Sequence, residues 1–214
     1  MHQNQEVLRI QSQLHEPGIK LGDLRKIAKE IKKNHSLAMV LWSTKEFLSR
    51  QLAILIMDPQ MLTQEVINQL DQDIQLHPQD EQLHLIDWLM ANQLSKDKKT
   101  IDLMLSWENS TSDLQRRIFW YYQARLRWVG QTPPLNTEKL LTKIEKHIES
   151  EVPSVQWAIN FTAAQIGISQ EEYRDRCIDL GIRTGLYKNE VVPKNCTPSY
   201  LPDFISIQVA KLKK

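Results

Sequence analysis

The prolines of this chain lie between apolar segments and not inside them. Four single prolines and one pair each open or close a segment: Pro17, Pro59, Pro78, Pro153 and Pro133–Pro134. Proline cannot donate the backbone hydrogen bond that a helix interior requires, so this placement marks the ends of helices.

Within the segments, apolar residues recur at the helical period of 3.6. Leu114, Ile118, Tyr122 and Leu126 form one such stripe. Ser112 has the spacing of a helix N-cap with a glutamine three residues later, and Ser169 has the same spacing with a glutamate. No alternating pattern of useful length indicates a strand. We therefore predict an all-α fold.

The predicted helices begin at intervals of roughly twenty residues, which is the spacing of helical hairpins stacked into a solenoid. We expect them at 5–15, 23–34, 36–57, 60–76, 79–94, 96–107, 112–128, 135–150, 153–167 and 170–186. No repeated sequence signature accompanies them, so the repeat would be structural only. A compact, irregular helical bundle is the alternative.

A chain of 214 residues suits one well-packed domain or at most two small ones. We predict a single domain over 1–214, in which the block 187–214 caps the last hairpin. Alternate helices of a two-layer array share a layer, so 36–57, 79–94, 112–128 and 153–167 would line one surface.

The charges are segregated although the net charge is only +1. No Lys or Arg occurs from Gln51 to Ser95, whereas basic residues gather at 20–33 and at 116–127. Such segregation can give a nearly neutral protein a basic face suited to nucleic acid. Ordinary solvated helix faces are the alternative.

Other features bear on location and chemistry. The first residues have no signal-peptide pattern, and the longest apolar run, 52–57, is too short to cross a membrane. Cys177 and Cys196 match no metal or redox spacing. We expect a cytoplasmic protein, associated with the nucleoid if the source is bacterial, that uses no membrane, metal or cofactor.

Three segments on alternate predicted helices combine a carboxylate, a guanidinium pair and aromatic rings: 83–88, 114–120 and 156–161. In this order they resemble the DNA alkylation repair glycosylases built from HEAT-like repeats. The turn and helix at 18–25, the turn at 107–110 and the tail at 185–202 are also similar to that family. The resemblance covers nearly the whole chain.

The resemblance implies a fold and an activity. It implies a HEAT-like array that excises cationic 3- or 7-alkylated purines from double-stranded DNA, as a monomer without metal or base flipping. Asp87 lies at the position of the catalytic aspartate and Arg116 at that of a functional arginine. Phe161 lies in the helix where a second functional tryptophan normally sits. These three side chains should then share one groove.

The chemistry explains why such residues would be wanted. Cleavage of the glycosidic bond builds positive charge on the sugar, which a carboxylate such as Asp87 stabilises. Aromatic faces attract a cationic base, and arginines hold the phosphates. The candidate DNA contacts are Arg116, Arg117, Trp157, Phe161, Arg50 and Lys45.

The chain departs from the family at two positions. Leu83 replaces the aromatic residue four positions before Asp87, and Phe161 replaces a tryptophan with a smaller ring. Trp88 points about 100° away from Asp87 around the helix and cannot simply restore the first ring. Trp157 lies one turn before Phe161 on the same helical face, so it can add to the smaller ring at this second position.

Each candidate also has a purely structural interpretation. Asp87 can be a capping or paired carboxylate, and aromatic residues at helical spacing are often core. Two other functions therefore stay open, namely a non-catalytic DNA-binding relative and a helical-repeat scaffold for protein partners.

Overall fold

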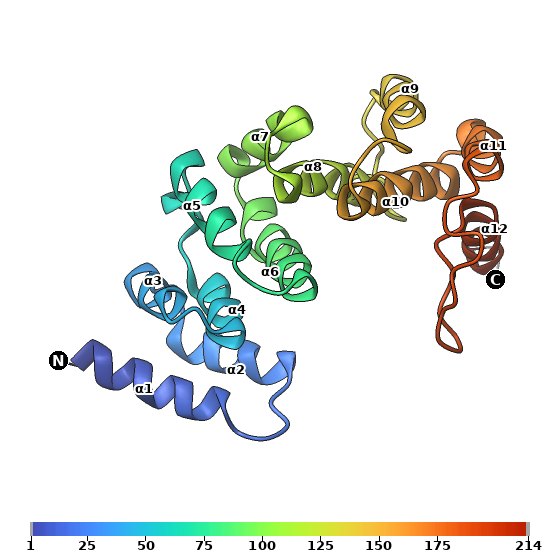
Figure 1. Ribbon diagram of the computed structural model, residues 1–214. Helices are drawn as coiled ribbons and strands as arrows, with labels where there is room; N and C mark the ends of the chain where they lie inside the picture. The colour runs from blue at the N-terminus through green and yellow to red at the C-terminus, as the bar shows by residue number, and fades with distance from the viewer. Residues whose placement is uncertain (1, 213–214) are drawn as a thin grey trace. The chain divides into compact units, whose positions relative to one another are not determined.

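The computed structural model describes residues 2–212, with side chains from residue 5 onward (Figure 1). Over these residues all regular structure is helical, which confirms the all-α prediction. No helix in this range is long and apolar enough to cross a membrane. The chain divides into two compact units, an N-terminal unit of residues 1–106 and a C-terminal unit of residues 107–214.

The N-terminal unit contains seven of the described α-helices. They are α1 (His2–Leu14), α2 (Leu21–Ile31), α3 (His35–Ser43), α4 (Phe47–Ile56), α5 (Gln64–Ile74), α6 (Gln79–Asn92) and α7 (Lys98–Ser106), with 3₁₀ turns at Pro59–Met61 and Leu94–Lys96. Helix α4 packs between α2 and α6, while α1 packs on α3 and α5 on α6. Helices α2, α4 and α6 therefore form one layer.

The C-terminal unit repeats this alternation. Its elements are α8 (Asp113–Arg125), α9 (Thr137–His147), α10 (Pro153–Ser169), α11 (Arg174–Thr184) and α12 (Leu201–Leu212), with 3₁₀ turns at Trp107–Asn109 and Glu171–Tyr173. Helix α10 packs between α8 and α12, and α9 and α11 pack against it. Within each unit, alternate helices share a layer. Helices α2 and α12 belong to these layers, whereas the sequence prediction placed only 36–57, 79–94, 112–128 and 153–167 in one layer.

The segment predicted as one helix over 36–57 is instead a hairpin of α3 and α4. The chain turns at Lys45, whose φ of 65° lies in the left-handed region. The hydroxyl of Thr44 donates to the Leu41 carbonyl at 2.7 Å and so ends α3. Continuous apolar periodicity conceals this break, because both arms of the hairpin bury side chains.

The two predicted caps have different outcomes. The Ser112 hydroxyl accepts a hydrogen bond from the Gln115 amide at 3.3 Å, which confirms the start of α8. Ser169 does not cap a helix, because it is the last residue of α10 and its hydroxyl donates to the Gln165 carbonyl. Helix α11 begins later than expected, at Arg174, after a 3₁₀ turn.

The C-terminal block contains a helix that the sequence pattern did not reveal. Helix α12 lies beside α11 and also packs on α10 (Figure 1). Two glycines permit this close approach. A Cβ atom at Gly181 would lie 2.6 Å from the Pro202 ring and 2.7 Å from Leu201 Cβ, and one at Gly167 would lie 2.7 Å from Ile205 Cδ1.

We expect Gly181→Ala to lower the free energy of unfolding by about 1–3 kcal/mol, because the added methyl group meets rigid neighbours that must shift. Urea denaturation followed by circular dichroism measures this change. Gly22→Ala in α2 is the matched control, because nothing lies within 4 Å of its added Cβ and alanine favours a helix. Equal stability of the two variants would contradict the close packing of α12.

Candidate nucleic-acid interface

The candidate catalytic carboxylate lies on α6 in the N-terminal unit. Asp87 is half-buried, and Leu83, one turn earlier, is half-buried as well. The buried residues of this helix are Leu85, Ile86, Leu89 and Met90. The side of α6 that carries Leu83 and Asp87 is therefore the edge of the core and not its centre.

An exposed arginine from α2 lies over the tryptophan that follows Asp87. The guanidinium carbon of Arg25 is 5.0 Å from the centre of the Trp88 ring. The indole N–H of Trp88 donates to the Gln51 carbonyl at 3.1 Å, which fixes the ring against α4. Sequence reasoning did not assign Arg25 a role, because its contact with Trp88 depends on tertiary packing.

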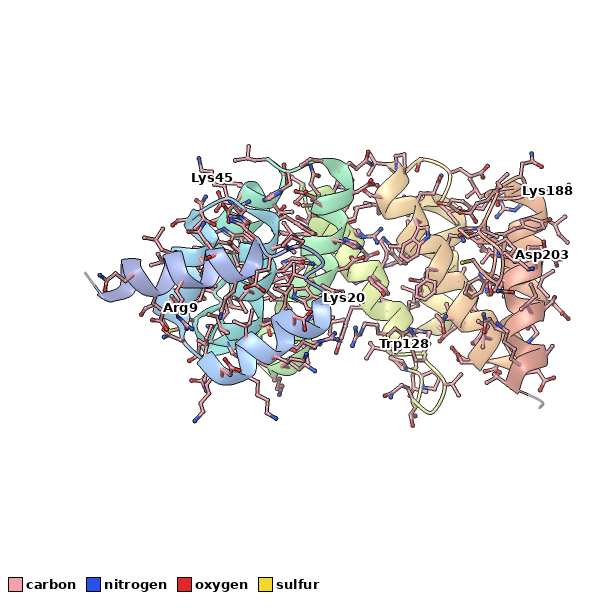
Figure 2. The ribbon with its side chains drawn as sticks, turned by 90° about the horizontal axis from the view of Figure 1, so that it is seen from below. Arg9, Lys20, Lys45, Trp128, Lys188 and Asp203 are labelled. Atoms are coloured by element: carbon pink, nitrogen blue, oxygen red, sulfur yellow. The ribbon has the colours of Figure 1, made fainter. Side chains whose placement is uncertain are left out.

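Arg25 begins a stripe of exposed cations on α2. Lys29 follows it one helical turn later, and Lys32 is the residue just after the end of α2, where φ is 63°. Over the described residues, none of these three side chains forms an ion pair, whereas Lys26 pairs with Asp23 at 3.0 Å. We call Arg25, Lys29 and Lys32 the α2 cation stripe. Lys20, labelled in Figure 2, stands just before the helix.

The two cations predicted on 36–57 have different environments. Lys45 is exposed on the turn between α3 and α4 (Figure 2). Arg50 is only 2% exposed and donates to the carbonyl oxygens of Trp42 at 3.2 Å and Asp73 at 2.6 Å. Burial lowers the pKa of Arg50, and the charge of Asp73 opposes that shift. Arg50 is a structural residue and leaves the set of candidate DNA contacts.

Arg116, on α8 of the C-terminal unit, is held by acidic side chains. Its Nε and Nη2 each lie 3.1 Å from a carboxylate oxygen of Glu151, and Nη2 also donates to Asp113 at 2.7 Å. Burial opposes the charged guanidinium, but the bonds and charges of Glu151 and Asp113 outweigh it and raise the pKa of Arg116. A DNA phosphate would have to compete with these two carboxylates.

Arg117 supports an aromatic ring. It is 5% exposed, its Nη1 donates to the Ser154 carbonyl at 2.8 Å, and its guanidinium carbon lies 4.7 Å from the centre of the Trp157 ring. Arg117 is therefore largely buried, and its predicted contact with DNA stays a prediction.

The predicted aromatic wall exists on α10. Trp157 and Phe161 stack with ring centres 5.2 Å apart and planes 8° apart, which confirms that they share one helical face. Tyr121 of α8 meets both rings edge-on, at 5.8 and 5.6 Å, and Phe204 of α12 meets Phe161 edge-on at 6.1 Å. Sequence reasoning missed Tyr121 and Phe204.

Asp87 belongs to the N-terminal unit, whereas Arg116 and Phe161 belong to the C-terminal unit. Their placement in one common groove stays a prediction.

A family model described as "DNA alkylation repair enzyme" matches residues 3–182. The chain belongs to this family. This match confirms the predicted resemblance, and α12 lies beyond its end. Asp87, Arg116 and Phe161 of this family member all fall inside the matched range.

The chain is also similar to a solved structure described as "A new family of proteins related to the HEAT-like repeat DNA glycosylases with affinity for branched DNA structures". The TM-score is 0.71 at 20% sequence identity, over 96% of this chain and 87% of that one. The predicted HEAT-like helical-repeat fold is therefore confirmed. Comparison with curated proteins gives no significant match.

Proposed function

We propose that this protein binds DNA through the sugar–phosphate backbone and recognises the structure of the DNA. The observation that carries the proposal is the α2 cation stripe, three exposed cations without carboxylate partners in the described structure. One of them, Arg25, lies over the Trp88 ring of α6, next in sequence to Asp87. Lysine and arginine contacts to phosphates supply most of the affinity of such binding.

Two comparisons support the proposal. Membership of the DNA alkylation repair family makes DNA the expected partner. The structural neighbour is described as having affinity for branched DNA, and we extend that preference to this chain as part of the proposal. Arg116 carries less of the binding in this proposal, because Glu151 and Asp113 already offset its charge.

The experiment is a salt titration of DNA binding, with a four-way junction and a duplex of equal length. We expect affinity for both to fall steeply with salt, with a log–log slope of about −0.9 per phosphate contacted. Lys29→Ala with Lys32→Ala should flatten the slope by about two units, because two phosphate contacts are lost.

The matched control is Lys139→Ala with Lys146→Ala, a pair of exposed lysines on α9 that are not ion-paired in the described structure. This pair should leave the slope unchanged. An equal effect of the two pairs would assign the binding to overall charge and not to α2. Absence of binding at low salt would overturn the proposal and favour a scaffold for protein partners.

A second candidate is slow excision of alkylated purines, in which Asp87 would be the catalytic residue. The specific observation is that Asp87 lies at the partly exposed edge of α6, outside the core. The positive base would lack one aromatic wall, because Leu83 has no π-face. Excision would proceed without metal or cofactor on duplex DNA.

The proposal includes a monomeric protein in the cytoplasm, associated with the nucleoid if the source is bacterial. Light scattering coupled to size-exclusion chromatography tests the monomeric state, and a molar mass near twice 25.1 kDa would contradict it.

Cell fractionation before and after nuclease treatment tests the proposed location. Location in a fraction that nuclease leaves unchanged would count against it.

A further inference from the structure

A pocket of about 350 Å³ opens beside the aromatic wall of the C-terminal unit. It is lined by side chains from the turn after α8, from α10 and from α12: Trp128, Val129, Phe161, Gln165, Ile168, Phe204, Gln208, Lys211 and Leu212. Helix α12, which lies beyond the family match, supplies four of these nine residues. The pocket therefore depends on the C-terminal block.

The lining combines aromatic rings with amides and one cation. Trp128, Phe161 and Phe204 provide π-faces, Gln165 and Gln208 provide hydrogen-bonding groups, and Lys211 provides positive charge. None of its described lining residues is acidic. Two other pockets differ in this respect, because one includes Glu138 and Glu172 and the other Glu16, Asp23 and Glu30.

Trp128 is the most accessible ring of this pocket, with 39% of its surface exposed. The guanidinium carbon of Arg125 lies 4.8 Å from its ring centre, so a second cation stands beside the pocket. The residue before Trp128, Arg127, is fully buried and hydrogen-bonded to Gln123 and Asn136. These bonds hold the backbone in place next to Trp128. The Trp128 ring therefore extends from a segment of backbone that is held in place.

We propose that this pocket receives one unpaired nucleobase of a DNA strand, with the flanking phosphate held by Lys211 and Arg125. This inference rests on the proposed DNA binding and names the part of the DNA that the pocket recognises. Every base has a π-face, so stacking on aromatic side chains accepts any sequence. Branched DNA that carries a single-stranded flap or gap exposes such bases.

The volume and the charge fit this ligand. The pocket lies at the small end of the range for ligand sites, about 300–1,000 Å³, which suits one base and not a longer segment. The two cations and the absence of acid from its described lining favour an anionic ligand. A base with its phosphate supplies both the aromatic face and the negative charge.

The test compares two DNA molecules of equal length and charge, one fully paired and one with a short unpaired bubble that contains 2-aminopurine. We expect the bubble to bind more tightly, by between about fivefold and a hundredfold for one stacked base. The fluorescence of 2-aminopurine should fall on binding, because stacking on an aromatic ring quenches it.

Substitutions in the pocket test whether it causes the preference for the bubble over the duplex. Trp128→Ala and Lys211→Ala should each reduce the ratio of bubble to duplex affinity, whereas Trp128→Phe should retain most of it because a ring remains. Ile182→Ala and Lys194→Ala, which change exposed residues outside the pocket, are the matched controls. Circular dichroism verifies that each variant is folded.

The outcomes separate this inference from the proposed function. Equal affinity for bubble and duplex, or a preference that Trp128→Ala leaves unchanged, would overturn the pocket assignment while DNA binding stands. Absence of binding to any DNA would overturn both. Deoxyadenosine monophosphate that binds as tightly as the bubble would assign the pocket to free nucleotides and would also overturn the inference.

Discussion

Arg127→Ala is expected to lower the free energy of unfolding of the C-terminal unit by about 3 kcal/mol. The side chain is fully buried, and burial lowers its pKa to about 10, which shows how unfavourable the site is for a charge. Hydrogen bonds offset that cost. Nη1 donates to the Gln123 carbonyl at 2.9 Å, and Nη2 donates to Asn136 Oδ1 at 2.6 Å and to the Thr137 hydroxyl at 3.2 Å.

Alanine would remove these donors and leave the acceptors buried in a cavity. Calorimetry should show a melting temperature lower by about 6–12 °C, since 1 kcal/mol corresponds to about 2–4 °C in a chain of this length. Arg183→Ala is the control, because Arg183 is exposed and its contact with Glu149 is 3.8 Å long. A loss below 1 kcal/mol for Arg127→Ala would contradict this account of the buried network.

Asp87→Asn is expected to reduce excision of 7-methylguanine or 3-methyladenine by about a hundredfold or more, if Asp87 stabilises the charged sugar. The substitution keeps the shape of the side chain and removes its charge. Leu83→Trp should raise the rate by up to about thirtyfold, because one aromatic wall contributes about 0.5–2 kcal/mol. Leu83 is half-buried, so a larger side chain has room to extend toward solvent.

Single-turnover release of base from alkylated duplex measures both effects. Asp102→Asn, an exposed carboxylate on α7, is the control and should leave the rate unchanged. Excision that survives Asp87→Asn would remove Asp87 from the mechanism. Absence of excision from both the natural chain and Leu83→Trp would eliminate the second candidate function and leave DNA binding alone.

The helices were predictable because proline positions and apolar periodicity are local properties of the sequence. The break at Lys45 was not, since it depends on a left-handed residue that the flanking apolar stripes conceal. Helix α12 was missed for another reason. It is docked by close contact with Gly167 and Gly181, and such a contact leaves no periodic pattern in the sequence.

The sequence predicted which residues could form the candidate site, but not the surroundings of each side chain. Trp157 and Phe161 share a face because four residues make about one helical turn. Arg116 and Arg117 are neighbours in sequence, yet one lies between two carboxylates and the other under a tryptophan ring. Asp113 is a local partner three residues before Arg116, but Glu151 and Trp157 lie about one hairpin further along the chain, so only tertiary structure reveals their contacts.

Four arginine–tryptophan pairs recur in the described structure, and they fall into two kinds. Arg50 and Arg117 are buried against their rings, whereas Arg25 is exposed and Arg125 half-exposed over theirs. A flexible cation loses about 0.5–1.5 kcal/mol of conformational entropy when a ligand immobilises it. A guanidinium that already rests over a ring has less of that freedom left to lose. If these two accessible arginines bind phosphate as proposed, they would lose less entropy than a free lysine, and lysine at either position would keep the charge without this advantage.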